Sequence, residues 1–326
     1  MADPLDLIIC TACGIQYPTS TTPPSCKICD DPRQYIPPSG QNWTTLRTLQ
    51  SDKEKKYTNT FTPTTKHPTT LISIQTTPKL AIGQRALLCR LPSGKNVLWD
   101  CLTYIDEETV ARINELGGLD AIVISHPHYF STHLVWAEAF GCQVYMSGED
   151  KEWAVRRGEG QVFWEGKELE LGLGLLSSSS SSPSATTSLA RAESGGGAEE
   201  EGADIVAIKT GGHFPGSSVL WWRSKRSLMV ADTIFVVPSG VYHVDREPGT
   251  TSFSFMWSIP NMIPLPPDEV HNIWKAIAHT DFDDTYGAFP GSETYGNSRK
   301  RVLESAKIIV KAMGYLDHVI HQEVYS

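Results

Sequence analysis

The stretch "ISHPHYFSTH", residues 124–133, places two histidines one residue apart directly after a run of apolar residues. The apolar run, Asp120–Ser125, predicts a buried strand, so His126 and His128 lie in the loop after its carboxyl end. Functional groups of α/β proteins collect at such strand ends. Two imidazoles in this position are typical of a metal site.

Strands and helices alternate around this loop. The sequence predicts a strand at 96–102, a helix at 107–117, the strand at 120–125, a helix at 131–141 that ends at Gly141, and a strand at 142–147. This order requires a sheet that is covered by helices. Shorter strands follow at 161–166, 167–176, 204–212, 218–223 and 227–232, and helices follow at 268–278 and 298–313.

Four cysteines near the start of the chain form two Cys-x-x-Cys pairs with twelve residues between them: Cys10, Cys13, Cys26 and Cys29. Four thiolates at this spacing can close around one tetrahedral ion, which predicts a four-cysteine zinc ribbon over residues 1–44. Disulfides and a rubredoxin-like iron site are the alternatives. Such a module depends on its metal to fold. We therefore expect the ribbon to be a folding element and not part of a catalytic site.

Composition limits the classes of protein that the chain can be. Its 326 residues are 40% hydrophobic, enough for one large domain, here 45–326, beside a small module. The net charge of −9 argues against a nucleic-acid partner, despite basic clusters at 53–56 and 299–301. No segment predicts a secretory signal or a membrane span, so we expect a cytoplasmic protein, with a nuclear location also compatible.

Residues 177–203 have a different composition from the rest of the large domain. They are rich in Ser, Gly and Glu, and they have almost no aromatic or β-branched residues. Such a segment cannot bury enough apolar surface to offset the entropy of ordering it. The sequence therefore predicts a disordered insertion that acts as a spacer.

Two further fragments complete a ligand set. "TGGHFPGS" places His213 in a turn after a predicted strand, and "LMVADT" places Asp232 at the end of another. With His126 and His128, this gives three imidazoles and one carboxylate, all at strand ends. Three nitrogens and one oxygen form a ligand set typical of zinc.

The fragments also resemble a known family. "NVLWDCLTYID", "LDAIVISHPH", "TGGHFPGSSVLWW" and "LMVADT" are similar, in this order, to the motifs of the metallo-β-lactamase superfamily, from about Leu71 onward. "HPHYFSTHLVWAEAF", "SFMWSIPNMIPL" and "YGAFPG" resemble an uncharacterised branch whose fungal members carry a Cys-rich N-terminal knuckle. The resemblance implies an α/β (α+β) fold, an αββα sandwich of two mixed sheets faced by helices, preceded by the small zinc-ribbon module.

The resemblance also implies roles for the ligands. The three histidines match the family's three-histidine site, and Asp232 matches the carboxylate that bridges two metals. Phe130 and Ser131 stand where the family has an aspartate and a histidine of the second metal site. The family's last histidine has no match either, because "YGAFPG" stands in its place. We therefore expect a reduced, mononuclear site, and two zinc ions per chain with the ribbon.

Other residues are weaker candidates. Ser131 is predicted as the N-cap of the helix that follows it. His133 and His279 are possible extra ligands, although a helix-capping role fits His279 better. Tyr129 and Tyr286 either pack in the core or donate a hydrogen bond to a developing oxyanion.

These features predict a zinc-dependent hydrolase that acts on an unknown small ester, lactone, thioester or amide. Asp232 would be a ligand or, as a catalytic group, would orient the attacking water. The alternative is a non-catalytic, metal-stabilised binding or regulatory protein whose ribbon recruits a protein partner. An iron oxidoreductase is disfavoured, because the extra carboxylate ligands of di-iron relatives are missing.

Overall fold

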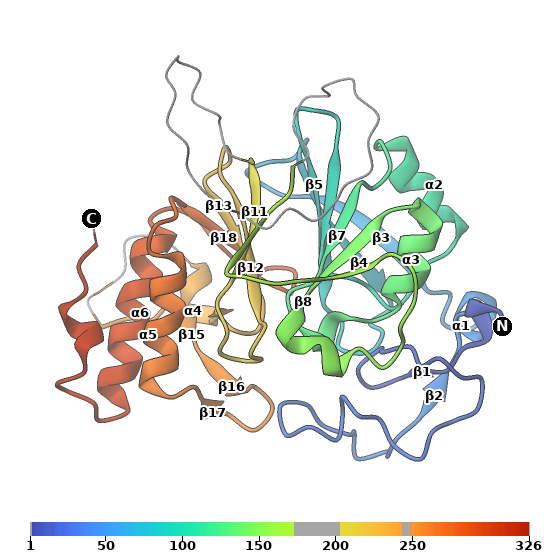
Figure 1. Cartoon of the computed structure of the whole chain (residues 1–326), viewed down its shortest axis with the longest axis horizontal. Helices are drawn as coiled ribbons and strands as arrows, with labels where there is room; N and C mark the ends of the chain where they lie inside the picture. The colour runs from blue at the N-terminus through green and yellow to red at the C-terminus, as the bar shows by residue number, and fades with distance from the viewer. Residues whose placement is uncertain (1, 173–202, 243–246, 248, 326) are drawn as a thin grey trace.

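The computed structural model describes residues 2–172, 203–242, 247 and 249–325. Nearly all of the insertion predicted at 177–203 therefore lies outside the described residues. Two sheets face each other at the centre of the fold, and helices cover their outer faces (Figure 1). This is the predicted αββα arrangement.

The first sheet has seven strands in the order β3-β4-β5-β6-β7-β8-β9. The first four pair antiparallel and the last four pair parallel, sharing β6, so the sheet is mixed. The strands are β3 (Thr58–Pro63), β4 (Leu71–Thr77), β5 (Arg85–Arg90), β6 (Asn96–Trp99), β7 (Ala121–Val123), β8 (Gln143–Ser147) and β9 (Gln161–Trp164).

The second sheet has six strands in the order β10-β11-β12-β13-β18-β19, and only β13 and β18 pair parallel among its described strands. Its strands are β10 (Glu168–Glu170), β11 (Ile205–Lys209), β12 (Ser218–Trp222), β13 (Ser227–Met229), β18 (Asp284–Tyr286) and β19 (Glu293–Thr294). Two short antiparallel pairs lie outside the sheets: β14 (Phe235–Val236) with β15 (Phe253–Ser254), and β16 (Met256–Ser258) with β17 (Ile263–Pro264).

Alternate residues of each strand point to opposite faces, and this alternation builds three apolar layers. Along β6, Leu98 packs toward the helices, whereas Val97 and Trp99 pack between the sheets. Along β11, Ala207 packs between the sheets and Val206 packs toward the helices on the other side. The central strands of both sheets are therefore buried on both faces, which leaves their ends as the place for polar side chains.

The helices lie close to their predicted positions. In α2 (Glu107–Glu115), Asp106 accepts a hydrogen bond from the Thr109 backbone N–H at 2.8 Å and so caps the helix. Gly141 ends α3 (His133–Phe140) in the left-handed conformation, as predicted. The other helices are α1 (Leu46–Ser51), α4 (Pro238–Val241), α5 (Pro267–Ile277) and α6 (Ser298–Ala312), with 3-10 turns η1 (Pro4–Asp6), η2 (Pro127–Tyr129), η3 (Gly148–Trp153) and η4 (Val319–Gln322).

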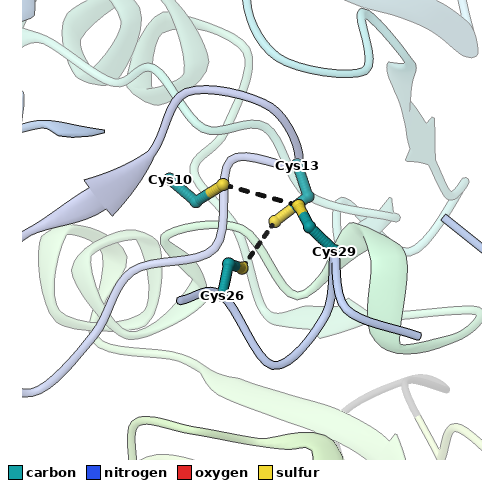
Figure 2. A group of neighbouring side chains, drawn as sticks. All are labelled: Cys10, Cys13, Cys26 and Cys29. Carbon is teal, nitrogen blue, oxygen red and sulfur yellow. Dashed lines mark hydrogen bonds between the residues drawn. The ribbon is translucent and has the colours of Figure 1, made fainter. Parts of the chain in front are cut away.

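The four ribbon cysteines lie together as free thiols (Figure 2). Sγ atoms of Cys10 and Cys29 are 3.6 Å apart, as are those of Cys13 and Cys26. A tetrahedral zinc ion with Zn–S bonds of about 2.3 Å separates its sulfurs by roughly 3.8 Å, whereas a disulfide requires about 2.05 Å. The cluster fits one metal ion and does not fit a pair of disulfides.

The ribbon is packed against the rest of the chain. Its strand β1 (Ile9–Cys10) pairs with β2 (Trp43–Thr44), and its apolar side chains belong to the same cluster as the helix-facing side of the first sheet. The backbone N–H of Gln16 donates to the Ser131 carbonyl at 3.2 Å. The boundary at residue 44 remains a prediction, because these contacts give both parts a common core.

Within the described part of the chain, no helix has the length and apolar character that crossing a bilayer requires.

Candidate metal centre

Three strand ends from the two sheets meet at one edge of the sandwich. His126 and His128 follow β7 of the first sheet, His213 follows β11 of the second, and Asp232 follows β13. Beside them, the Ser218 backbone N–H donates to the Ser125 carbonyl at 3.0 Å and joins the sheets. The fold therefore brings together four side chains that are up to about a hundred positions apart in sequence.

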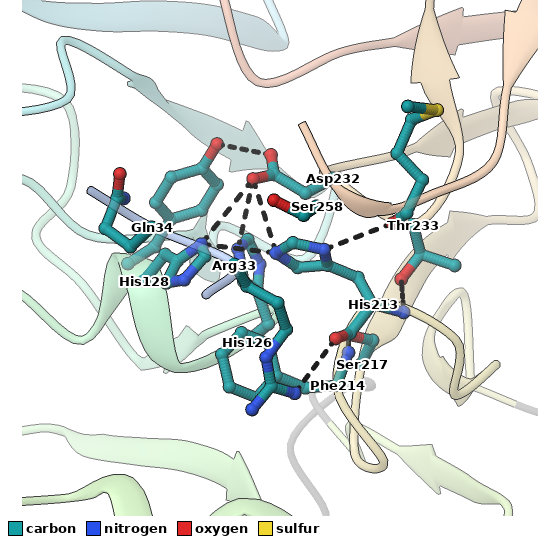
Figure 3. A network of polar contacts seen from close by, with 12 residues as sticks. Arg33, Gln34, His126, His128, His213, Phe214, Ser217, Asp232, Thr233 and Ser258 are labelled. Atoms are coloured by element: carbon teal, nitrogen blue, oxygen red, sulfur yellow. Dashed lines mark hydrogen bonds and ion pairs between the residues drawn. The ribbon is translucent and has the colours of Figure 1, made fainter. Parts of the chain in front are cut away.

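The four side chains form a compact group around the Asp232 carboxylate (Figure 3). Its Oδ2 lies 3.5 Å from His126 Nε2, 3.7 Å from His128 Nδ1 and 3.8 Å from His213 Nε2. His128 Nδ1 and His213 Nε2 are 3.2 Å apart. A tetrahedral zinc ion with bonds of about 2.0–2.1 Å would separate its ligand atoms by roughly 3.3 Å. The arrangement fits one such ion, and the buried His126 Nε2 has no hydrogen-bond partner among the described residues.

Two of the imidazoles are oriented by contacts behind them. His126 Nδ1 lies 2.8 Å from the Ser125 hydroxyl, and the Ser125 backbone N–H donates to Asp100 at 2.8 Å. The Nδ1–H of His213 donates to the Met256 carbonyl at 3.2 Å. Such partners fix the tautomer that leaves the other ring nitrogen free for a metal. Burial raises the pKa of Asp100 to about 6.

The second oxygen of Asp232 has a different partner. Its Oδ1 accepts a hydrogen bond of 2.7 Å from the Tyr129 hydroxyl, and the Tyr129 side chain is fully buried. Oδ2 alone therefore faces the imidazole nitrogens. Tyr129 was predicted either to pack in the core or to donate to an oxyanion; its ring packs in the core, and its hydroxyl donates to the Asp232 carboxylate.

The protonation states suit metal binding. Burial lowers the pKa of His128 to about 4 and that of His213 well below its usual range, so both rings are neutral near pH 7. Burial alone would raise the pKa of Asp232, but the neighbouring His126, with His128 and His213 beside it, holds that pKa well below its ordinary value. Neutral imidazole and ionised carboxylate are the forms that bind metal.

Comparison with known proteins identifies the family. The sequence model of the metallo-beta-lactamase superfamily, as a protein family, matches residues 85–284 of the chain. The chain belongs to this superfamily.

The chain is also similar to individual proteins. The chain is 38% identical over 310 residues to the uncharacterized protein YmaE of Bacillus subtilis (strain 168), covering 94% of this chain and 96% of that one. Among solved structures, VMB-1 superposes with a TM-score of 0.51 at 9% identity, covering 78% of this chain and 98% of that one. The DIM-1 metallo-beta-lactamase gives a TM-score of 0.48 at 11% identity, covering 78% of this chain and 98% of that one. The relative named here is bacterial, so the expected fungal affiliation stays a prediction.

Ser131 does not act as the predicted N-cap. Thr132 occupies that position before α3, and Ser131 adopts a left-handed backbone with φ of 47°. The Ser131 hydroxyl donates to the Cys101 carbonyl at 3.4 Å and accepts from Gln84 at 3.3 Å. The reason is the turn η2, which ends at Tyr129 with Phe130 as its C-cap. The chain then changes direction through the left-handed conformation of Ser131, so α3 begins only at His133.

The other histidine and tyrosine candidates lie outside the four-ligand cluster. His133 is buried behind it: its Nδ1–H donates to the Phe130 carbonyl at 2.8 Å, and Gln161 donates to its Nε2. His279 follows the end of α5, where its Nε2 lies 3.0 Å from a carboxylate oxygen of Glu168 in place of the predicted cap. Tyr286 packs in the layer between the sheets.

Arg33 of the ribbon was not predicted at the site, yet it lies beside the three imidazoles (Figure 3). Its guanidinium donates to the His213 carbonyl at 3.1 Å and lies 3.7 Å from the Phe214 ring centroid. The Phe214 ring packs edge-on against His128, with centroids 5.0 Å apart. The ribbon therefore borders the histidine cluster, and its predicted role as a folding element stays a prediction.

The turn that carries His213 depends on its glycines. Gly212 has φ of +89°, and a Cβ there would lie 3.0 Å from both Ile273 and Leu265. Gly211 has φ of +67°, and a Cβ there would meet only the Pro215 carbonyl, at 3.6 Å. Both positions favour glycine, but only Gly212 also lacks space.

We expect Gly212→Ala to weaken zinc binding at the histidine cluster by about ten-fold more than Gly211→Ala, because only the first change displaces His213. Competition with a chromophoric chelator measures both affinities, with unfolding midpoints recorded in parallel. Equal zinc affinities in the two variants would show that the packing around Gly212 does not position the ligand.

Proposed function

We propose that the chain is a zinc-dependent hydrolase with a mononuclear site made by His126, His128, His213 and Asp232. The observation that carries this proposal is the spacing of the four ligand atoms, 3.2 to 3.8 Å for four of their six pairs and within 4.8 Å for all of them. Those values suit a small tetrahedral ion, and a set of three imidazoles and one carboxylate favours zinc.

Zinc in this position would polarise a substrate carbonyl and lower the pKa of a coordinated water toward neutrality. The residues of this chain have supporting tasks. Ser125 and Met256 orient two of the imidazoles, and the Asp232 carboxylate balances part of the positive charge. Phe214 and Arg33 cover one side of the cluster and limit the access of water. A small ester, lactone, thioester or amide is the substrate class that this chemistry suits.

A single ion at the site is supported by the surroundings of Asp232 Oδ1. That oxygen, which would bind a second ion, accepts the hydrogen bond from Tyr129. Phe130 is buried and offers no ligand atom, and the Ser131 hydroxyl is engaged with the Cys101 carbonyl. We propose one zinc ion here and one structural zinc ion on the four cysteines, two per chain.

One observation favours the alternative of a non-catalytic, metal-stabilised protein. Asp232 Oδ2 occupies the fourth corner of the tetrahedron, and the four ligand side chains are at most 9% exposed. A closed four-ligand site is typical of structural zinc. Catalysis requires either a fifth ligand or the displacement of the carboxylate, so turnover separates the two functions.

His126→Ala should lower the zinc affinity of the histidine cluster, so that the zinc content falls from two ions per chain toward one, and remove any hydrolysis, because the ion loses one of its three imidazole ligands. Elemental analysis gives the count, and a panel of p-nitrophenyl esters, lactones, thioesters and amides gives the activity. His279→Ala is the control, since its ring pairs with Glu168 at the surface. Two retained ions in His126→Ala would contradict the ligand assignment. A wild-type protein with two ions and no turnover on the panel would favour the non-catalytic alternative.

Tyr129 should decide whether a second ion can bind beside the first. Phe130→Asp with Ser131→His restores two of the family's three missing ligand types, the last histidine still being absent, and histidine tolerates the left-handed backbone at position 131. We expect no third ion in this double variant while Tyr129 occupies Oδ1, and a third ion once Tyr129→Phe is added.

Tyr129→Phe alone should keep two ions but lower zinc affinity by about ten-fold, because the carboxylate loses its orienting donor. Elemental analysis and chelator competition on all three variants, each checked for native circular dichroism, measure these effects. A third ion bound equally well with Tyr129 present would show that the hydroxyl does not exclude it.

A further inference from the structure

The ribbon loop, residues 31–34, contacts the hairpin formed by β16 and β17. The carbonyl oxygen of Pro32 accepts two hydrogen bonds of 2.8 Å, one from the Ser258 hydroxyl and one from the Asn261 amide. Ser258 lies in β16 and is fully buried. The loop is therefore fixed to the hairpin at a buried position.

The next residue of the loop, Arg33, contacts the His213 turn. Asp31 accepts hydrogen bonds of 2.6 and 2.8 Å from the Arg33 guanidinium, which fixes its orientation. The same group donates to the His213 carbonyl and lies over the Phe214 ring. The Arg33 side chain is only 11% exposed, so these contacts are shielded from solvent. Such a doubly bonded, stacked arginine is rigid.

These contacts begin and end at one proposed metal ligand, His213. The His213 ring donates to the carbonyl of Met256, which lies in the same strand, β16, as Ser258. Ser258 holds Pro32, and the adjacent Arg33 holds the His213 backbone. The imidazole and the backbone of His213 are thus positioned by two elements that the ribbon loop ties together.

The loop begins directly after the second cysteine pair. Asp31 follows Cys29 by two residues, and the Asp30 backbone N–H donates to the Cys26 carbonyl at 2.9 Å. A metal ion on the cysteines fixes the geometry of this knuckle, whereas knuckles without metal are typically unfolded. The position of Arg33 therefore depends on the cysteine cluster.

We propose that the two metal clusters are coupled through the ribbon loop, so that an ion on the four cysteines raises the affinity of the histidine cluster for its own ion. This inference rests on the proposed assignment of both clusters as metal sites. Arg33 is then a positioning residue that acts through His213. Because coupling between binding sites is reciprocal, an ion at the histidine cluster must stabilise the ribbon's ion by the same factor.

A ribbon that only folds independently would give no such coupling, and the chain offers a matched control. Arg156 also joins the ribbon to the large domain, but its guanidinium donates to the Gln16 side chain, which lies between the two cysteine pairs and not in the ribbon loop. Arg156→Ala thus removes a ribbon contact of the same kind and leaves the contacts of the ribbon loop and of His213 in place.

The test uses the full-length protein and cobalt(II) as the probe. Cobalt bound by four thiolates and cobalt bound by three imidazoles and a carboxylate have different absorption spectra, so each cluster is observed separately. Chelator competition then gives the cobalt affinity of the histidine cluster in wild type, Cys29→Ser, Arg33→Ala, Arg33→Lys and Arg156→Ala.

We expect Cys29→Ser and Arg33→Ala to lower the cobalt affinity of the histidine cluster by about ten-fold and to shift its spectrum. Arg33→Lys should recover part of this loss by keeping a cation over Phe214, and Arg156→Ala should stay within about two-fold of wild type. Arg33→Ala retains all four cysteines, so it tests the coupling even where Cys29→Ser fails to fold.

Wild-type affinity and spectrum in Arg33→Ala would overturn the coupling and leave the metal assignment in place. An equal loss in Arg33→Ala and Arg156→Ala would also overturn it, because the effect would then be general loosening of the ribbon. A wild-type histidine cluster that binds no cobalt would overturn both the coupling and the proposed function.

Discussion

The rest of the metal centre depends on the contacts of the Asp232 carboxylate, whose two oxygens have different partners. Oδ2 faces three imidazole nitrogens, whereas Oδ1 is bound to the Tyr129 hydroxyl. A buried charge of this kind is costly, by about 3–5 kcal/mol, when a partner is missing. Both oxygens therefore need partners, and the identity of each partner sets the number of ions. We propose that, with the Tyr129 phenol on one oxygen, a single ion on the other completes the site.

The supports of this centre come from three parts of the chain that are distant in sequence. The edge of the sandwich supplies the four ligand residues, the β16–β17 hairpin holds the His213 ring, and the ribbon loop holds the His213 backbone. The N-terminal module is thus part of the wall of the metal centre rather than an appendage beside it.

The sequence predicts the regular parts of this structure well. Apolar periodicity locates the central strands, the glycine at position 141 ends its helix, and three histidines and one aspartate at strand ends predict the cluster. Local patterns fail where long-range contacts decide. Ser131 has the composition of an N-cap, but the turn before it forces a left-handed backbone. The Tyr129 hydroxyl contacts Asp232, which is 103 residues away in sequence, and Arg33 contacts His213, which is 180 residues away. No local sequence pattern could indicate either contact.

The most direct test of the account is a crystal structure of the zinc-loaded protein with anomalous data collected on both sides of the zinc absorption edge. We expect two anomalous peaks per chain. One lies among the four cysteine sulfurs, and the other is bound by His126 Nε2, His128 Nδ1, His213 Nε2 and Asp232 Oδ2, with the Tyr129 hydroxyl still hydrogen-bonded to Oδ1. A third peak on the Oδ1 side of Asp232, with Tyr129 displaced, would contradict the account.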